Sequence, residues 1–370
     1  ELLLWHTKLS HAHLRWVRAL LGSRSWLHDP SHASNPSPII PPVNKAASTA
    51  DVSGMKCACC AMAKAHVRTP NTTQLRTIDE MVLKRNHLQR GERVSLDHYV
   101  ASRPGRMWNT RSSGKGNQYN GGSLYVDHAS TFMFNYSQHT LQAAETIRGK
   151  TLFEQEARNI GVNIKSYRTD NGVFASQAFK QHCAGQDQDI SYSGPHAQHE
   201  NGVAERAIKT VSQWARANLI HLALRWPAAA QLTLWPMAMS YSVWCYNRLP
   251  KEGCGMSPME MWYQSRSDHL ELRRARPFGC PVYVLDTKLA NGQSIPKWNP
   301  KARLGMFVGF SPHHSSLVPL VLNLRTNSIT PVYHLIFDET FSTVASTITP
   351  AQLNTQWATL LRSSSECFVD

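Results

Sequence analysis

The sequence predicts an α/β protein of more than one domain, in which a mixed α/β core follows a small helical segment and precedes a small β segment. The chain has 370 residues, too many for one ordinary hydrophobic core, and 42% of them are hydrophobic, which is enough for globular domains. From residue 92 onward, strand-like alternation and helix-like periodicity follow each other repeatedly. After residue 276, short strand-like runs are separated by turn residues.

The first segment, residues 1–68, is predicted to be small and helical. Apolar residues recur at helical spacing over residues 5–28. Residues 29–54 lose this periodicity and contain five prolines, so we expect a flexible insertion there. A cysteine cluster with a basic flank closes the segment, and residues 69–91 are expected to be a connector.

The core, residues 92–265, is predicted to hold five strands and a long helix that begins after the Asn201-Gly202 turn. The long helix has an apolar stripe at 3.6-residue spacing and a polar face opposite to it. A solvated Glu–Lys pair is the simpler interpretation of that polar face, and a surface for metal and phosphate is the functional one. The polar face comprises Glu205, Lys209, Ser212 and Arg216. The strands are expected at Val94–Tyr99, Ser123–Asp127, Thr131–Tyr136, Val162–Arg168 and Ile190–Tyr192, and further helices at 140–160, Ala175–Cys183 and Leu234–Asn247.

The third segment, residues 266–345, is predicted to be a small antiparallel barrel. Residues 346–370 have no strong pattern and are expected to form an irregular tail. The predicted strands are Pro281–Leu285, Leu304–Phe310, Val318–Leu324, Ser328–Val332 and His334–Phe337.

The chain is basic, with a formal net charge of +14 that is spread over all three main segments. This charge predicts a polyanionic partner, and a generically basic protein is the alternative. No apolar run reaches the roughly eighteen residues of a membrane-spanning helix, and the start of the chain lacks the features of a signal peptide. The absence of an initiator Met predicts a piece of a longer protein. Eight cysteines, three of them close together, favour a metal site in a reducing compartment over a disulfide framework.

Three carboxylates lie in motifs that suit phosphodiester chemistry with metal ions. Asp97 ends the alternating run Arg93–Asp97, Asp170 lies in the motif Ser166–Gly172 just after a predicted strand, and Glu205 lies on the long helix. Hard divalent cations need several oxygen ligands that converge on one point, and these three acids can supply them. Asp127 and Glu200 lie near the same motifs, and we interpret them as a structural acid at a strand end and a loop residue.

Two histidines and two cysteines have the ligand types of a structural Zn²⁺ site, namely His6, His11, Cys57 and Cys60. Two residues separate the cysteines, a common spacing for zinc ligands, and four separate the histidines. His13 can replace His11, and Cys59 can replace Cys57. The alternative is that the histidines cap an ordinary helix and the thiols are free.

The motifs run in order along the chain and resemble those of one family. They are Leu4–His11, Cys57–Lys64, Arg168–Gly172, Asn201–Arg206, Tyr246–Pro250, Ser257–Trp262, Phe278–Pro281, Gly305–Phe310 and Ile336–Glu339. In these motifs the chain resembles the integrase portion of the Gag-Pol polyprotein of copia-type (Pseudoviridae) LTR retrotransposons, and more loosely retroviral integrase.

The resemblance implies an RNase H-like catalytic core with a mixed five-stranded sheet, between an HHCC zinc-binding domain and an SH3-like β-barrel. It implies a DDE-type enzyme that joins the 3′ ends of element cDNA to host target DNA. Asp97, Asp170 and Glu205 would be its catalytic triad and would bind two Mg²⁺ (or Mn²⁺) ions, and one Zn²⁺ would be structural. A homo-oligomer, no membrane, and a nuclear location after cytoplasmic virus-like particles are expected as well.

Nucleic-acid contacts are expected from basic and polar residues near these motifs, and phosphate contacts of this kind depend on salt. The first candidates are Lys64, Asn201, Arg206, Lys209 and Arg216, followed by Arg68, Arg273, Arg274 and Arg276. For any single one of them, a solvated surface role is the simpler interpretation. Two other functions compete with the integrase: an inactive or domesticated nucleic-acid-binding remnant, and an RNase H-like nuclease without joining activity.

Overall fold

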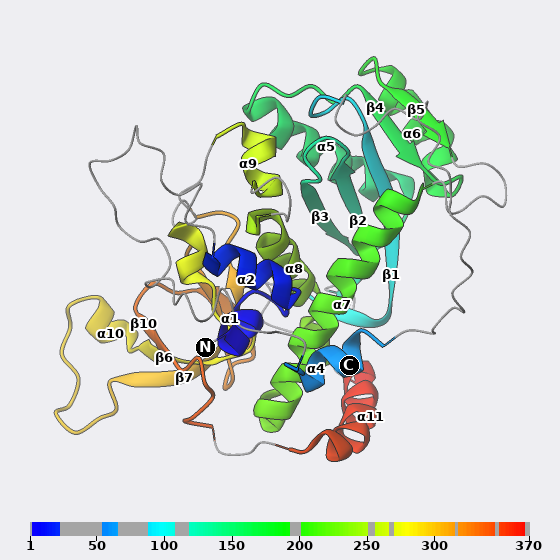
Figure 1. Cartoon of the computed structure of the whole chain (residues 1–370). Coiled ribbons are helices and arrows are strands. Elements are labelled where there is room, and N and C mark those ends of the chain that lie inside the picture. The colour runs from blue at the N-terminus through cyan, green and yellow to red at the C-terminus, as the bar shows by residue number, and fades with distance from the viewer. Residues whose placement is uncertain are drawn as a thin grey trace.

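The computed structural model describes residues 2–22, 54–65, 88–107, 118–192, 201–250, 256–265, 270–314, 317–344 and 348–366. The predicted insertion and most of the predicted connector lie outside these residues, so neither prediction is tested. Two five-stranded sheets and the helices around them make up the described fold (Figure 1).

The first sheet has the strand order β3-β2-β1-β4-β5. Its first three strands are antiparallel neighbours, whereas β4 and β5 run parallel to β1. This mixed five-stranded sheet confirms the predicted RNase H-like core. The strands are β1 (Val94–Arg106), β2 (Gln118–Asp127), β3 (Met133–Gln138), β4 (Ser166–Thr169) and β5 (Asp189–Tyr192).

Two of these strands extend beyond the bounds that the sequence predicts, Val94–Tyr99 and Ser123–Asp127. β1 continues to Arg106 and β2 begins at Gln118, and these two residues pair with each other. The sequence there is polar and rich in glycine, which is typical of loops. The backbone ladder between the two strands, interrupted by a bulge after Val100, outweighs that local preference.

Alternate residues of β1 face two different hydrophobic cores. Val94 and Leu96 pack with α5 (Ala143–Asn159) and α6 (Gln177–Ala184), whereas Tyr99 packs with α7 (Gly202–Arg225) and α8 (Trp235–Arg248). Because side chains alternate along a strand, Asp97 lies on the α7 face and His98 on the α5 face.

The N-terminal segment folds as two short helices and not as the single helix predicted over 5–28. α1 (Leu2–Lys8) and α2 (Leu14–Gly22) are separated at Ser10 and His11, whose φ angles are +57° and +56°. Positive φ cannot continue an α-helix, and the periodicity of the apolar residues does not reveal such a break. α4 (Ala58–Ala63) follows and packs against α7.

The second sheet is antiparallel throughout, in the place of the predicted barrel, with the order β10-β6-β7-β8-β9. Its strands are β6 (Pro281–Leu285), β7 (Ala302–Phe310), β8 (Pro319–Asn323), β9 (Ser328–Pro331) and β10 (Leu335–Phe337). Two short helices accompany it, α9 (Pro258–Tyr263) before the sheet and α10 (Thr287–Ala290) between β6 and β7.

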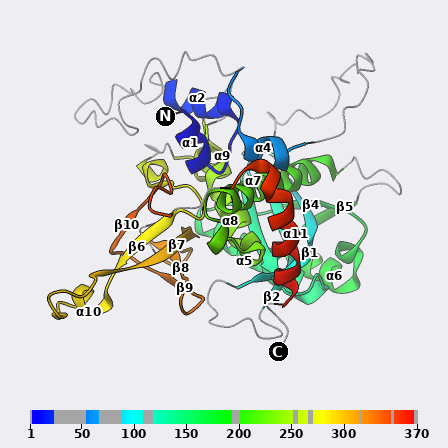
Figure 2. The same ribbon diagram turned by 90° about the horizontal axis from the view of Figure 1, so that it is seen from below.

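The prediction of an irregular tail is wrong, because residues 350–366 form α11 (Pro350–Glu366). This helix packs against α7 and β1, as both views show (Figures 1 and 2). Leu353 of this helix is buried, and Trp357, Leu360 and Leu361 are partly buried against the same core. Among the described residues, none of the helices has the length and apolar character needed to cross a membrane.

Two candidate metal sites on one long helix

The three acids predicted from the motifs come from three adjoining elements. Asp97 lies within β1, Asp170 follows the end of β4, and Glu205 lies in the first turn of α7. Asp97 is partly buried, whereas Asp170 and Glu205 are exposed. The parallel pairing of β1 with β4 and the contact of α7 with β1 bring these elements together.

The electrostatics of Asp97 show that the three acids influence each other. The pKa of the Asp97 carboxyl is raised to about 6. Burial is the largest cause, and the negative charges of Asp170 and Glu205 act in the same direction. The backbone N–H of His98, which donates to Oδ1 of Asp97 at 2.8 Å, acts in the opposite direction. Carboxylates that repel each other in this way are stabilised by a bound cation.

Asn201 does not lie where a nucleic-acid contact requires it. Its side chain is 2% exposed, and its Nδ2 donates to the carbonyl oxygen of Leu96 at 3.2 Å. The prediction that Asn201 binds nucleic acid is therefore not supported. Its hydrogen bond instead ties the start of the Glu205 helix to the residue that precedes Asp97.

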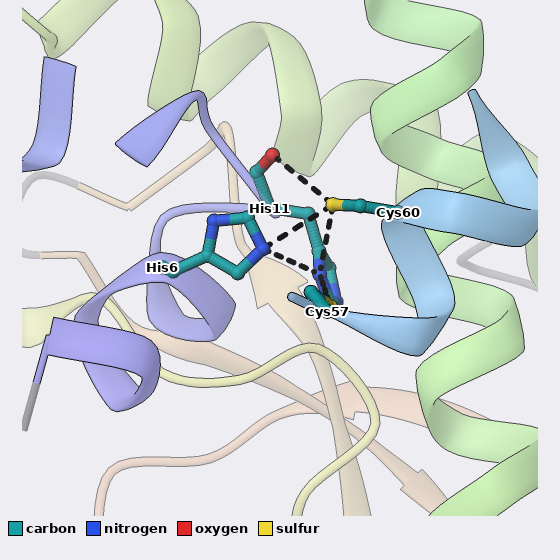
Figure 3. Close-up of side chains that lie close together, drawn as sticks. All are labelled: His6, His11, Cys57 and Cys60. Carbon is teal, nitrogen blue, oxygen red and sulfur yellow. Dashed lines mark hydrogen bonds between the residues drawn. The ribbon is translucent and has the colours of Figure 1, made fainter. Parts of the chain in front are cut away.

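The predicted zinc ligands converge on one point. The ligand atoms of His6, His11, Cys57 and Cys60 all lie within 4.8 Å of one another (Figure 3). Nε2 of His6 lies 3.2 Å from Sγ of Cys60, and Nδ1 of His11 lies 3.5 Å from Sγ of Cys57. Among the described residues, this is the only group of three or more His, Cys, Asp or Glu side chains whose ligand atoms lie this close together. Two histidines and two thiols fit a tetrahedral Zn²⁺ ion.

The surroundings of this site favour the metal-binding forms of its ligands. Nδ1–H of His6 donates to the carbonyl oxygen of Ala12 at 2.7 Å, which leaves Nε2 free as a ligand. Burial lowers the pKa of His11 to about 4, so its ring is neutral near pH 7. Hydrogen bonds from Cys59 and Cys60 lower the pKa of the Cys57 thiol, and the bond to Cys57 raises that of Cys60. Cys57 is thus the thiol that ionises more readily, and a bound cation would displace the proton of Cys60.

The two alternative zinc ligands are not part of this group of four. Cys59 is buried on the core side of α4 and hydrogen-bonds to Cys57, and His13 is exposed. The αL backbone at His11 accounts for the spacing of the two histidines, since it turns the chain so that His11 faces His6.

The same long helix contacts both candidate sites. Glu205 lies in its first turn, and His221, near its end, lies edge-on to His11 with ring centroids 5.3 Å apart. Asn218 donates to Oγ of Ser10 at 2.6 Å, which adds a buried polar contact between α7 and the N-terminal segment. From Ala217 to Leu224 every residue of α7 is buried.

The basic residues predicted to contact nucleic acid divide into two groups. Lys64 and Arg216 make internal contacts: Nζ of Lys64 donates to the His11 carbonyl oxygen at 2.6 Å, and Nη1 of Arg216 donates to that of Ala63 at 3.2 Å. Arg206 and Lys209 are exposed in the first turns of α7. Arg276 pairs with Glu339 at 2.8 Å, and Arg274 is exposed. Arg68 and the side chain of Arg273 lie outside the described part of the chain.

A basic group on the β6–β7 connection was not among the predicted contacts. Trp298 is 88% exposed, and Nζ of Lys297 lies 5.1 Å from the centroid of its ring. This connection, with α10, projects away from the body of the protein (Figure 1). The run Pro296–Pro300, with a tryptophan beside a lysine, is the signal that marks it in the sequence. The exposed cations of this connection are Lys288, Lys297 and Lys301; Arg303 of β7 and Arg325, between β8 and β9, are exposed as well.

No family model matches the chain. Over 224 residues the chain is 26% identical to the Retrovirus-related Pol polyprotein from transposon RE2 of Arabidopsis thaliana. The matched part is 58% of this chain and 14% of the polyprotein, so the chain spans a small part of that relative. This similarity agrees with the LTR-retrotransposon integrase that the motifs resemble.

Solved structures similar to this chain include three of integrases. The catalytic core domain of HTLV-2 integrase, in complex with magnesium and in its dimeric form, has a TM-score of 0.33 and 20% identity, and covers 47% of this chain and 98% of that one. The simian T-cell lymphotropic virus intasome in complex with PP2A regulatory subunit B56 gamma has a TM-score of 0.36 and 16% identity, over 68% and 79%. The catalytic core domain of BIV integrase has a TM-score of 0.33 and 12% identity, over 47% and 95%.

Proposed function

We propose that this chain, a relative of a transposon Pol polyprotein, is a DDE-type integrase that joins the 3′ ends of element cDNA to target DNA. The observation that carries the proposal is that burial, together with the negative charges of Asp170 and Glu205, raises the pKa of the Asp97 carboxyl to about 6. Carboxylates held together at such a cost usually serve chemistry rather than stability.

The proposed roles of the three acids follow from the elements that bear them. Asp97 is held by a central strand, Asp170 is presented at a strand end, and Glu205 closes the group from the helix. Two Mg²⁺ (or Mn²⁺) ions, when bound there, would polarise the scissile phosphate and stabilise the attacking and leaving oxygens. Because the three acids would share two ions, they need not be packed as closely as the four zinc ligands.

The nucleic acid would bind beside the acids. Arg206 and Lys209 are exposed on the same helix as Glu205, so they can pair with phosphates next to the reacting one. The basic group around Trp298 would contact a more distant stretch of DNA. The proposed Zn²⁺ would be structural, because four protein ligands leave no open position. A homo-oligomer that acts in the nucleus, after assembly in cytoplasmic particles, belongs to the same proposal.

The test is Mg²⁺-dependent joining of a blunt duplex oligonucleotide to plasmid DNA by the full chain. Asp170→Asn is expected to reduce joining at least about 100-fold, because it removes an anionic metal ligand, and to leave DNA binding unchanged. Asp187→Asn is the matched control: it also neutralises an exposed aspartate, and its φ of +52° suits asparagine.

Four outcomes decide the proposal. Joining by the wild type and by Asp187→Asn, with loss in Asp170→Asn, supports it. Equal joining by all three proteins contradicts the site. A wild-type chain that binds DNA and joins nothing is the inactive remnant, and one that only cuts DNA is a nuclease.

A further inference from the structure

His98 lies directly after Asp97 on β1, and its side chain lies on the opposite face of the sheet. There its ring stacks on Phe174, with centroids 4.4 Å apart and planes 29° apart. Phe174 belongs to the short helical turn Val173–Ala175 that follows Asp170. One stacked pair therefore connects the strand of Asp97 with the loop of Asp170.

Phe174 anchors that loop to the core. Its side chain is buried and packs edge-on against Phe179 of α6, with ring centroids 5.5 Å apart. Its carbonyl oxygen accepts a hydrogen bond from the Tyr192 hydroxyl at 3.1 Å. Asp170 is held on one side by Thr169, the last residue of β4, and on the other side by the turn that contains Phe174, with exposed Asn171 and Gly172 between them.

His98 is itself fixed by a hydrogen bond. Nε2 lies 3.0 Å from Oγ1 of Thr146 on α5. The Thr146 hydroxyl donates to the carbonyl oxygen of Gln142 at 3.0 Å, so toward His98 it can act only as an acceptor. Nε2 of His98 is therefore the protonated nitrogen, and the ring orientation is set by α5.

We propose that His98 is a positioning residue for the Asp97–Asp170 metal site: its stacked ring holds the loop that presents Asp170 to the metal. The inference rests on the proposed function. Residues that orient metal ligands without touching the metal contribute about 10- to 100-fold in metal affinity or activity. Loss of the His98 ring should therefore weaken metal binding and leave the fold intact.

The experiment measures Mn²⁺ binding to the zinc-loaded full chain by electron paramagnetic resonance, and the Mg²⁺ concentration that gives half-maximal joining. His98→Ala is expected to raise both constants about tenfold. His98→Phe keeps a flat ring over Phe174 and loses only the hydrogen bond, so it should restore most of the affinity. Phe174→Leu removes the stacked pair from the other side and should resemble His98→Ala.

His128→Ala is the matched control. His128 is also buried and also bonds to β1, through Oγ of Ser95 at 2.8 Å, but it does not belong to the stacked pair of His98 and Phe174. Its substitution should change stability without changing the metal constants. Circular dichroism verifies the fold of each variant, and Phe174→Leu provides the same test should His98→Ala unfold.

The outcomes separate this inference from the proposed function. Weaker Mn²⁺ binding in His98→Ala and Phe174→Leu, with rescue in His98→Phe, supports the inference. Unchanged Mn²⁺ binding in the first two, alongside weakened binding in Asp170→Asn, overturns it. Equal weakening by His128→Ala also overturns it, because the effect would then be a general loss of stability. Absence of joining by the wild type counts against the proposed function alone, since Mn²⁺ binding is measured without DNA.

Discussion

At the scale of single residues, the ionised carboxylate of Asp97 destabilises the folded protein when no metal is bound. Burial and two neighbouring acids raise the pKa of its carboxyl to about 6 from an ordinary 3.8. A carboxyl with a raised pKa in the folded state favours folding below the ordinary pKa, and that contribution is lost as the pH rises through about 6. Above that pH, ionised Asp97 destabilises the metal-free protein.

Asp97→Asn is therefore expected to stabilise the metal-free site at pH 8 by about 2 kcal/mol, reduced from the full pKa shift because Asp97 is partly exposed. The gain should shrink as the pH falls through about 6 and should vanish below about 4. Urea unfolding of both proteins without Mg²⁺ at pH 5 and pH 8 measures it. A loss of stability at pH 8 would contradict the electrostatic interpretation.

Asp127→Asn is the control for this prediction, and its effect should have the opposite sign. Oδ2 of Asp127 accepts bonds from the N–H and the hydroxyl of Ser130 at 2.7 and 2.6 Å, and Oδ1 accepts from the N–H of Gly91 at 2.9 Å. An amide cannot accept on both sides, so the substitution should cost about 1–3 kcal/mol. The structure thus supports the interpretation of Asp127 as a structural acid at a strand end.

At the scale of elements, α7 shows what a sequence can predict and what it cannot. Its apolar stripe predicted the buried face, and Glu205 and Lys209 are exposed as expected. The roles of Arg216 and Asn201 depend on which distant segments lie beside them, namely α4 and the carbonyl oxygen of Leu96. Spacing along one helix carries no information about those partners.

Two further elements differ from prediction for separate reasons. The break between α1 and α2 follows from the αL backbone at Ser10 and His11, neither of them a glycine that would signal it. α11 does carry a signal, since Leu353, Trp357 and Leu360 recur at helical spacing, but the surrounding sequence is polar. By contrast, β6 has the same bounds in sequence and structure, because a short apolar run lies between clear turn residues.

Lys209 and Arg216 are expected to respond differently to substitution, although both lie on the exposed side of α7. Lys209→Ala should weaken DNA binding and reduce the slope of log affinity against log salt by about one. Arg216→Ala should leave that slope unchanged and lower stability by about 1 kcal/mol, because it removes a charged donor from the end of α4. Salt titrations of DNA binding and urea unfolding of both variants decide this. Equal salt slopes for the two variants would contradict the division.

At the scale of the whole molecule, one hydrophobic core joins segments from both ends of the chain. It includes Leu9 of the N-terminal segment, Val211 of α7, Phe307 of the second sheet and Leu353 of α11. Lys8 and Arg276 also share Glu339, at 3.0 and 2.8 Å, which links the first helix to the end of the second sheet. Among the described residues, the predicted zinc-binding segment therefore packs into the same core as the rest of the protein and does not form a separate domain.

Removal of zinc is consequently expected to lower the melting temperature of the whole chain in a single transition. Calorimetry with and without a zinc chelator measures this effect. Cys57→Ala should abolish the response to the chelator, and Cys59→Ala, which removes a thiol of the same segment that is not a ligand, should keep it. A separate low-temperature transition, with the main one unchanged, would show that the zinc unit melts independently.

The continuity of α7 sets a fixed span between its two ends. At about 1.5 Å per residue, the stretch from Glu205 to His221 is about 24 Å long. With about 3.4 Å per base pair, a straight duplex aligned with that helix would cover about seven base pairs over the same length. A duplex that reached from the acids to the proposed zinc site would do so at one register, and changing the number of helical turns in α7 would change that footprint by a known amount.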